Sequence, residues 1–450
     1  MILTNDTTRL ALTAACFAGY GLVCLLPYLR HRRKRAAARA EAEQGGWLVA
    51  YASQTGNAEE LAQQTAASLR LAGIAVRTVE LSGVDEAALL GAERALFIVS
   101  TYGEGDAPDA GAGFASRLMT REVALPNLHY AVLALGDSSY SHFCGFGRAL
   151  DGWLAAQGAQ PLFERIEVDR SSAAAISHWR QQLSHLAGTS DAPDWGAPAF
   201  AGWRLAARRI VNPGSAGAPL AHLELEPAEG ALPDWQSGDL VQLAPPSDPE
   251  HARDYSIASI PADGRVHLLV RLHTHTDGSH GAASGWLHQA ALGTIVPLRL
   301  RQHRRFRLEE NAGRPLILIG NGSGMAGLRG HLKARVRAGL GRNWLLFGER
   351  NAAHDAHYGE ELQAWRTAGL LERSDFAWSR DAGETVRYVQ DLLPLNAAAL
   401  RAWVADGAAI YVCGSLDGMA AGVDAALREV LGEAALNALA EEGRYRRDVY

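Results

Sequence analysis

Three glycine- and hydroxyl-rich segments in the first half of the chain have the composition of loops that bind a phosphorylated ring. They are SQTGNAEE (53–60), STYGEGDAPD (100–109) and LGDSSYSHFCGFG (135–147). Each follows an apolar, β-prone run, and helix patterns follow the first and the third. In a parallel α/β sheet such loops meet at the carboxyl ends of the strands, where nucleotides bind. The second half adds RDYS (253–256) and the strand-to-helix turn GNGSGMAG (320–327), so the set suggests an electron relay rather than a single-substrate enzyme.

The first loop has the features of a monophosphate site. Ser53, Thr55 and Asn57 can donate side-chain hydrogen bonds, and the backbone N–H groups and dipole of the following helix favour a dianion. The loop contains no lysine, which excludes a nucleoside-triphosphate loop. A plain N-cap turn would have the same composition.

The second and third loops add aromatic faces to this edge. Gly103 and Gly105 allow the backbone to approach a flat ring on which Tyr102 can stack, and Tyr140 offers a second face. Either tyrosine alone could be an ordinary half-buried aromatic, but the three loops together predict bound FMN. The predicted FMN-binding residues are Ser53, Gln54, Thr55, Gly56, Asn57, Ala58, Thr101, Tyr102, Gly103, Glu104, Gly105, Leu135, Gly136, Asp137, Ser138, Tyr140, Phe143, Cys144 and Asp169.

Composition limits the class of protein. A chain of 450 residues with 48% hydrophobic and 20% charged residues predicts two or three globular domains. Its four scattered cysteines form no CxxC pair or Cys/His cluster, so a disulfide framework or a zinc site is not expected. Residues 47–200 hold 17 Asp/Glu against 9 Lys/Arg. Such an acidic module argues against nucleic acid and suits a basic protein partner, although an ordinary acidic surface would look the same.

The N-terminal segment has the pattern of a membrane anchor. Residues 10–29 carry no charge, and RHRRKR (30–35) follows at once. This polarity is the reverse of a cleaved signal peptide, and it places the later residues in the cytoplasm, as at a bacterial inner membrane. The alternatives are a signal peptide or a buried soluble helix.

The element pattern predicts several domains along the chain. Strands at 47–52, 74–81, 95–101, 129–136 and 161–168 alternate with helices at 57–73, 146–158 and 173–188, which indicates a doubly wound parallel sheet. Short β-prone runs then predict an antiparallel barrel, and α/β alternation returns from Pro315. The expected domains are an anchor with its basic collar (1–35), a tether (36–46), an FMN domain (47–188), a linker (189–200), an FAD-binding barrel (201–308) and an NADP-binding domain (309–450).

Nearly the whole chain after the tether resembles the diflavin reductases. Residues 47–188 are similar to flavodoxin, and residues 200–450 are similar to a ferredoxin–NADP reductase module with a Rossmann-like NADP domain. The resemblance implies that electrons pass from NADPH through FAD and FMN to a one-electron acceptor. That acceptor would be a haemoprotein, such as the haem subunit of sulfite reductase, or a ferric chelate such as a ferric siderophore. A non-catalytic flavin-binding scaffold is a remote alternative.

Two motifs in the reductase half match the family's FAD site. The resemblance implies that Arg253 pairs with the FAD pyrophosphate, that Tyr255 packs on the isoalloxazine and that Ser256 bonds near its N5. The planar guanidinium group of an arginine can donate paired hydrogen bonds to the oxygens of a diphosphate. The matching residues are Arg253, Asp254, Tyr255, Ser256, Gly281, Ala282, Ala283 and Ser284. The nearby His273, His275 and His280 could suggest a metal, but the family uses none here, so loop histidines are expected.

A second set of motifs is similar to the family's NADPH site. By resemblance the turn at 322–324 holds the pyrophosphate, and an arginine at 380 favours NADPH over NADH because only NADPH has a 2′-phosphate. Arg380 could otherwise be a solvated surface charge. The residues implied are Gly322, Ser323, Gly324, Arg350, Ser379, Arg380, Tyr388 and Gln390.

The hydride-transfer residues are implied in the same way. Cys413, Ser256 and Asp448 match the family's constellation, and Tyr450 matches its terminal aromatic, which covers the FAD ring. A core cysteine and a free tail are the alternatives for Cys413 and Tyr450.

The sequence departs from the family's pattern in two places. Asn321 and Gly327 replace the family's usual prolines, and the short stretch from Leu240 to Tyr255 cannot hold the long helical insert of the eukaryotic members.

Overall fold

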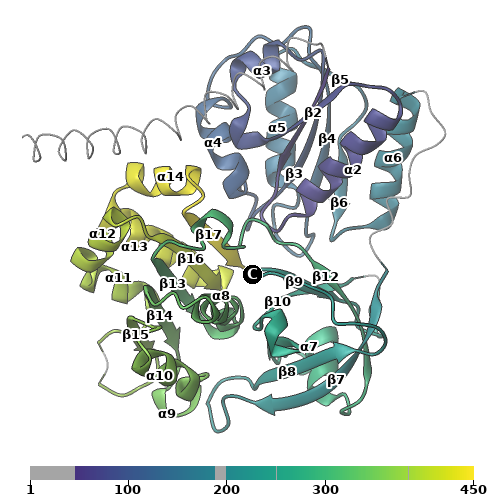
Figure 1. Ribbon diagram of the computed structural model, residues 1–450. Coiled ribbons are helices and arrows are strands. Elements are labelled where there is room, and N and C mark those ends of the chain that lie inside the picture. The colour runs from purple at the N-terminus through teal and green to yellow at the C-terminus, as the bar shows by residue number, and fades with distance from the viewer. Residues whose placement is uncertain (1–45, 188–198, 250, 384) are drawn as a thin grey trace, which may run out of the picture. The chain divides into compact units, whose positions relative to one another are not determined.

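The computed structural model describes residues 46–187, 199–249, 251–383 and 385–450. They form two compact units, each treated by itself below (Figure 1). The predicted anchor lies outside the described residues, as do its collar, nearly all of the tether and most of the predicted linker. Among the helices that the structure describes, none is both long and apolar enough to span a membrane.

The first unit is built on a parallel sheet with the strand order β2-β1-β3-β4-β5, in which β6 also pairs with β4. Its strands are β1 (Trp47–Ala52), β2 (Val76–Glu80), β3 (Arg94–Ser100), β4 (His129–Gly136), β5 (Gln160–Pro161) and β6 (Ile166–Asp169). Its helices are α2 (Asn57–Leu71), α3 (Glu86–Leu90), α4 (Asp109–Arg117), α5 (Gly145–Ala156) and α6 (Ala173–Ala187), with the 3-10 turn η1 (Leu81–Gly83). Figure 1 shows helices on both faces of this sheet, which explains why β3 and β4 are apolar and almost fully buried.

The predicted doubly wound sheet is therefore confirmed, with one correction. The run 161–168 was expected to be a single strand, but it forms β5 and β6 with residues 162–165 outside both. Pro161 has no N–H to donate to a ladder, and the charged pair Glu164–Arg165 breaks the apolar pattern. Helices α3 and α4 were not predicted; α3 is short, and α4 contains two glycines that weaken its helical signal.

The second unit begins with an antiparallel sheet in the order β10-β9-β12-β7-β8-β11, which confirms the predicted change from parallel to antiparallel pairing. Its strands are β7 (Ala201–Ile210), β8 (Leu220–Pro227), β9 (Leu240–Leu243), β10 (Arg253–Ser256), β11 (Val266–Arg271) and β12 (Ile295–Arg301). The 3-10 turn η2 (Pro261–Asp263) precedes β11, and helix α7 (Ala282–Gln289) precedes β12.

A five-stranded parallel sheet follows in the order β15-β14-β13-β16-β17. Its strands are β13 (Leu316–Asn321), β14 (Asn343–Glu349), β15 (Arg373–Trp378), β16 (Ala409–Gly414) and β17 (Tyr445–Val449). The helices are α8 (Met325–Arg337), α9 (Ala352–Asp355), α10 (Gly359–Thr367), α11 (Leu392–Leu395), α12 (Ala397–Ala405), α13 (Ala421–Leu431) and α14 (Glu433–Glu441), with the short turns η3 (Glu309–Asn311), η4 (Gly322–Gly324), η5 (Val389–Asp391) and η6 (Leu416–Ala420). This sheet confirms the α/β alternation predicted from Pro315 onward.

The two sheets of the second unit share a hydrophobic cluster. Leu220, Leu269 and Phe306 from the antiparallel part pack with Leu318 and Tyr411 from the parallel part. Since all five are buried, a continuous apolar core joins the two parts.

Candidate functional site

The three loops of the first half leave the sheet at one edge. The parallel register pairs Ala52 with Val99 and Ser100 with Leu135, so the strands β1, β3 and β4 end level with one another. The loop after β1 is a tight turn in which Gly56 N donates to Ser53 Oγ at 2.8 Å. The register therefore brings together the starts of all three predicted loops at the carboxyl edge, as expected for an FMN site.

The second and third loops are packed on each other. Gly105 has a φ of +121°, and a Cβ built there would lie 2.8 Å from His142 Cβ, so only glycine suits this position. Ser141 N donates to Glu104 Oε2 at 3.1 Å. The predicted residues Glu104 and Gly105 thus shape the loops in addition to any contact with a ring.

The third loop is braced by the end of β6. Ser138 donates to both oxygens of Asp169, from N at 2.9 Å and from Oγ at 2.7 Å. Cys144 has a left-handed φ of 54° and a buried thiol that lies 3.3 Å from Ala134 O. Burial raises the pKa of Cys144 to about 12, so this thiol is protonated at neutral pH. Asp169 and Cys144 hold the loop in place, while Tyr140 remains 37% exposed and accessible to a planar ligand.

The predicted FAD residues of the second unit line one cavity of about 410 Å³. Strand β10 contributes Arg253 to Ser256, and the start of α7 contributes Gly281 to Ser284. Ser323 and Tyr450 reach the same cavity from the parallel-sheet part. An arginine, a helix N-terminus and aromatic rings around one hollow have the donor chemistry that a dinucleotide with a flat ring requires.

Five further cavity-lining residues were not predicted as binding residues. They are Leu269, Arg271, His273, His275 and Ala326. Arg271 forms an ion pair with buried Glu349 at the end of β14. The rings of His273 and His275 lie edge to face at 4.7 Å. The sequence of β11, VHLLVR, could have pointed to Arg271, because a charged residue there ends a mainly apolar strand.

The structure brings the implied hydride-transfer residues together around Ser256, which lines this cavity. Ser256 Oγ donates to Asp448 Oδ2 at 2.7 Å, and Cys413 Sγ lies 3.8 Å from the same oxygen. The register of β16 with β17 places Cys413 beside Asp448. All three side chains are buried, so the geometry resembles a preorganised catalytic group rather than surface contacts.

Burial controls the charge states in this group. Burial and the neighbouring Asp448 raise the pKa of Cys413 well above its usual value, so Cys413 is a thiol and not a nucleophilic thiolate. His303 was missed by the sequence analysis; its Nδ1 lies 3.9 Å from Asp448 Oδ1. Burial lowers the pKa of His303, which keeps this imidazole neutral at neutral pH.

The C-terminal tyrosine is held over the cavity. Tyr450 N donates to Gly414 O at 3.1 Å, and its hydroxyl donates to Ser323 Oγ at 3.3 Å. The residue is 52% exposed. Burial of the hydroxyl raises the pKa of Tyr450 well above its usual value. About half of the residue is nevertheless exposed, and a hydrogen bond as long as 3.3 Å can be broken at small cost.

Replacing Tyr450 by alanine is expected to relax the preference for NADPH over NADH. We predict that the ring lies where a nicotinamide must approach Ser256 and Cys413, and that NADPH offsets its displacement through contacts to the 2′-phosphate that NADH lacks. We expect kcat with NADH to rise more than kcat with NADPH, and NADPH turnover can fall if product release becomes slow. The measurement is kcat and kcat/KM for both nucleotides with one saturating artificial acceptor. If the ratio of kcat/KM for NADPH to kcat/KM for NADH were the same as in the wild type, Tyr450 would have no part in nucleotide selection.

The glycine-rich turn before α8 fits a pyrophosphate site. A Cβ at Gly324 would lie 2.0 Å from Cys413 O, so the turn must be glycine to approach β16. Asn321, which replaces a usual proline of the family, accepts a hydrogen bond from Ser415 N at 2.9 Å. This bond ties the turn to the residue that follows β16.

The residues implied for the 2′-phosphate lie at or beside the carboxyl ends of β14 and β15. Arg380 N donates to Arg350 O and Ser379 N donates to Glu349 O, both at 2.8 Å. The Arg350 guanidinium lies against Gly217 of the turn between β7 and β8. Tyr388 is 56% exposed, and Gln390 packs on Gly422 of α13. The backbone pairing brings Arg350, Ser379 and Arg380 together; their contacts with NADPH remain predictions.

Comparison with known proteins identifies relatives of both halves of the chain. The flavodoxin family model matches residues 49–179, and the oxidoreductase NAD-binding domain matches residues 318–425. The chain is 31% identical to the sulfite reductase [NADPH] flavoprotein alpha-component of Neisseria meningitidis serogroup A, over 96% of this chain and 93% of that protein. It is 28% identical to the protein of the same name from Vibrio vulnificus, over 90% and 88%.

The alignment with the Neisseria relative includes many positions that have no counterpart in this chain. It spans 569 positions, against 450 residues in this chain, so the Neisseria relative has more than 100 residues that this chain lacks. Residues 244–252 alone join β9 to β10 here. The two matched domains and the extent of the similarity show that this chain belongs to the diflavin reductases, the family of NADPH-dependent flavoprotein oxidoreductases that includes the sulfite reductase flavoprotein alpha-components.

Proposed function

We propose that the chain takes a hydride from NADPH at its second unit and delivers single electrons from its flavodoxin unit to an acceptor. The observation that carries the proposal is the convergence of β10, the start of α7, Ser323 and Tyr450 on one cavity beside the Ser256–Asp448–Cys413 group. Bound FAD and FMN would supply the conversion of an electron pair into single electrons.

The chain's own side chains would bind the cofactors, orient the reacting groups and shield them from water. Arg253 and the N–H groups at the start of α7 would hold the FAD diphosphate, and the turn at 322–324 would hold that of NADPH. Asp448 fixes the hydroxyl of Ser256 at 2.7 Å, so the hydroxyl is oriented before a substrate arrives. Tyr450 would shield the cavity until nicotinamide displaces it.

The acceptor we propose is a haem-containing partner of the sulfite reductase type. The relatives are named sulfite reductase flavoprotein components, and the acidic composition of residues 47–200 suits a partner with a basic docking face. A ferric chelate is the second candidate, since it needs only an accessible edge near Tyr140, which is 37% exposed.

A comparison of acceptors tests this proposal. Under anaerobic conditions with NADPH, the purified chain should reduce the haem of a co-purified partner at low partner concentration, with rates that fall as salt rises. Reduction of a ferric siderophore at saturable, salt-independent rates, with no haem partner reduced, would favour the chelate. If no acceptor at all allowed the chain to oxidise NADPH, the non-catalytic flavin-binding scaffold would be the one remaining explanation.

We also propose that residues 10–29 anchor the chain in a membrane with the later residues in the cytoplasm. The support is the uncharged stretch followed by RHRRKR. Membrane fractionation of the full chain and of a variant lacking residues 1–35 tests it. Recovery of both in the soluble fraction would overturn the anchor.

A further inference from the structure

Helix α8 connects the predicted NADPH-binding turn with the end of β10, the strand that carries the predicted FAD-binding residues. It starts directly after the turn at 322–324 and contacts β13, β16 and β11 (Figure 1). A Cβ at Gly327 would lie 3.1 Å from Cys413 Sγ and 3.7 Å from Ser256 Cβ. At Gly330 it would lie 2.8 Å from Ile257 O, which is closer than real side-chain carbons approach. The helix therefore lies directly on the backbone that follows Ser256.

Arg329 anchors this helix by three kinds of contact. Its Nε and Nη2 donate to the two oxygens of Glu361 in α10 at 2.6 and 2.9 Å, and Nη1 donates to Ala258 O at 2.7 Å. Its Cζ lies 4.4 Å from the ring centroid of Tyr358. The residue is only 6% exposed. A buried, planar, bidentate group fixes orientation as well as distance, so one guanidinium sets α8, α10 and the segment after β10 relative to one another.

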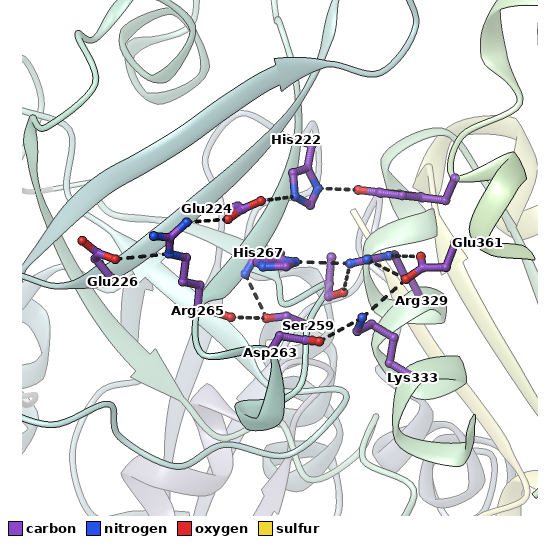
Figure 2. Close-up of polar contacts among 12 residues, drawn as sticks. His222, Glu224, Glu226, Ser259, Asp263, Arg265, His267, Arg329, Lys333 and Glu361 are labelled. Carbon is purple, nitrogen blue, oxygen red and sulfur yellow. Dashed lines mark hydrogen bonds and ion pairs between the residues drawn. The ribbon is translucent and has the colours of Figure 1, made fainter. Parts of the chain in front are cut away.

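Other polar contacts surround this anchor (Figure 2). Lys333 Nζ lies 2.9 Å from Asp263 in η2 and 3.4 Å from Glu361. His222 Nδ1 lies 2.8 Å from Tyr358 OH. Burial lowers the pKa of His222 to about 3 and that of His267 to about 4, so both imidazoles are neutral at neutral pH. They add hydrogen bonds to the interface without adding buried charge.

A metal is a poorer explanation of this group. His222, Glu224 and His267 place potential ligand atoms within 4.8 Å of one another. Arg265 donates to Glu224 at 2.9 Å, however, and Arg329 Nη1 lies 3.4 Å from His267 Nδ1. Two guanidinium groups facing the ligand atoms disfavour a cation. The histidines therefore belong to the interface between the antiparallel sheet and helices α8 and α10.

We infer that Arg329 is a positioning residue for hydride transfer: by clamping α8 to Glu361 and to Ala258 O, it holds the NADPH-binding turn in register with Ser256 and Cys413. The inference rests on the proposed function, because it needs NADPH to react at this cavity. Arg329 lies two residues after Gly327, so a loss of the clamp displaces the residues that face the reacting atoms. A displacement of about 1 Å can slow a reaction about 100-fold.

The test is the rate of FAD reduction by NADPH in the full chain with Arg329→Met. We expect the limiting rate in anaerobic stopped flow to fall about 10- to 100-fold, with a larger primary isotope effect from NADPH deuterated at the transferred position. The NADPH concentration for half-maximal rate should change little, because the phosphate contacts are retained. Arg329→Lys, which keeps the charge but loses the fork, should recover part of the rate.

Two further variants separate positioning from a structural role. Arg342→Met removes an arginine that also has two carboxylate partners, Glu372 and Asp406, but whose side chain is 46% exposed; its hydride rate should equal that of the wild type. Glu361→Gln keeps the volume and weakens the clamp, so it should slow the reaction to a lesser degree if Arg329→Met does not fold.

The inference would be overturned if Arg329→Met reduced bound FAD at the wild-type rate per FAD, even if its stability or FAD content fell. If Arg329→Met does not fold, the same result in Glu361→Gln would overturn it. Failure of the wild type itself to reduce bound FAD with NADPH would instead overturn the proposed function. The two failures are therefore distinguishable.

Discussion

Replacing Asp448 by alanine is expected to slow the reduction of bound FAD by NADPH about 100-fold. The carboxylate accepts a hydrogen bond from the Ser256 hydroxyl at 2.7 Å and lies 3.8 Å from Cys413 Sγ, and all three side chains are buried. Without it, the serine hydroxyl can rotate and the thiol loses its polar neighbour, so both groups lose the orientation that binding would otherwise exploit. Single-turnover stopped flow with NADPH measures this step without any acceptor.

Asp448→Asn is the matched control for this prediction. The amide oxygen can still accept from Ser256, but the negative charge is gone. A loss of less than about 3-fold in Asp448→Asn, roughly a quarter of the alanine effect in free energy, would assign most of the effect to orientation. If Asp448→Ala retained the wild-type rate at normal FAD content, the Ser256–Asp448–Cys413 group would have no part in hydride transfer.

Replacing Arg380 by alanine is expected to raise KM for NADPH about 10- to 100-fold while KM for NADH changes little. A charge-assisted hydrogen bond to phosphate contributes about 1.5–3 kcal/mol, and NADH has no phosphate at this position. The backbone pairing of Arg380 with Arg350 at 2.8 Å places its side chain where parallel strands end, which is where nucleotides bind.

Arg401→Ala is the control for nonspecific loss of positive charge, because Arg401 is exposed and lies on α12, which contains none of the residues assigned to NADPH. It should leave the ratio of the two KM values close to that of the wild type. If Arg380→Ala weakened NADPH and NADH equally, the 2′-phosphate would be held elsewhere, and Arg350 would be the next residue to test.

Much of the fold could be predicted because its signals are local. The apolar runs of β1, β3 and β4 and the glycine-rich turns after them are contiguous in sequence, and β13 with its turn has the same form. Strand β17 escaped prediction because its sequence, YRRDV, has three consecutive charged residues. It is a strand because it completes the parallel sheet beside β16, which no local pattern reveals.

The site was only partly predictable for a related reason. Ser256, Cys413 and Asp448 were assigned by family resemblance, and the structure brings them together across a separation of 192 residues. His303 and Arg329 carry no motif of their own; their importance comes from burial and from partners far away in the chain. A buried arginine on the helix after the NADPH turn is a signal that could be sought in other sequences.

The most direct test of the central claim is a count of flavins combined with NADPH reduction. Cofactor released by heat from the purified full chain should separate into one FMN and one FAD per chain, and NADPH added without oxygen should reduce both. Each half has its own candidate phosphate sites, so neither flavin should be displaced by loss of the other. A single flavin species per chain, or two flavins that NADPH leaves oxidised, would contradict the account.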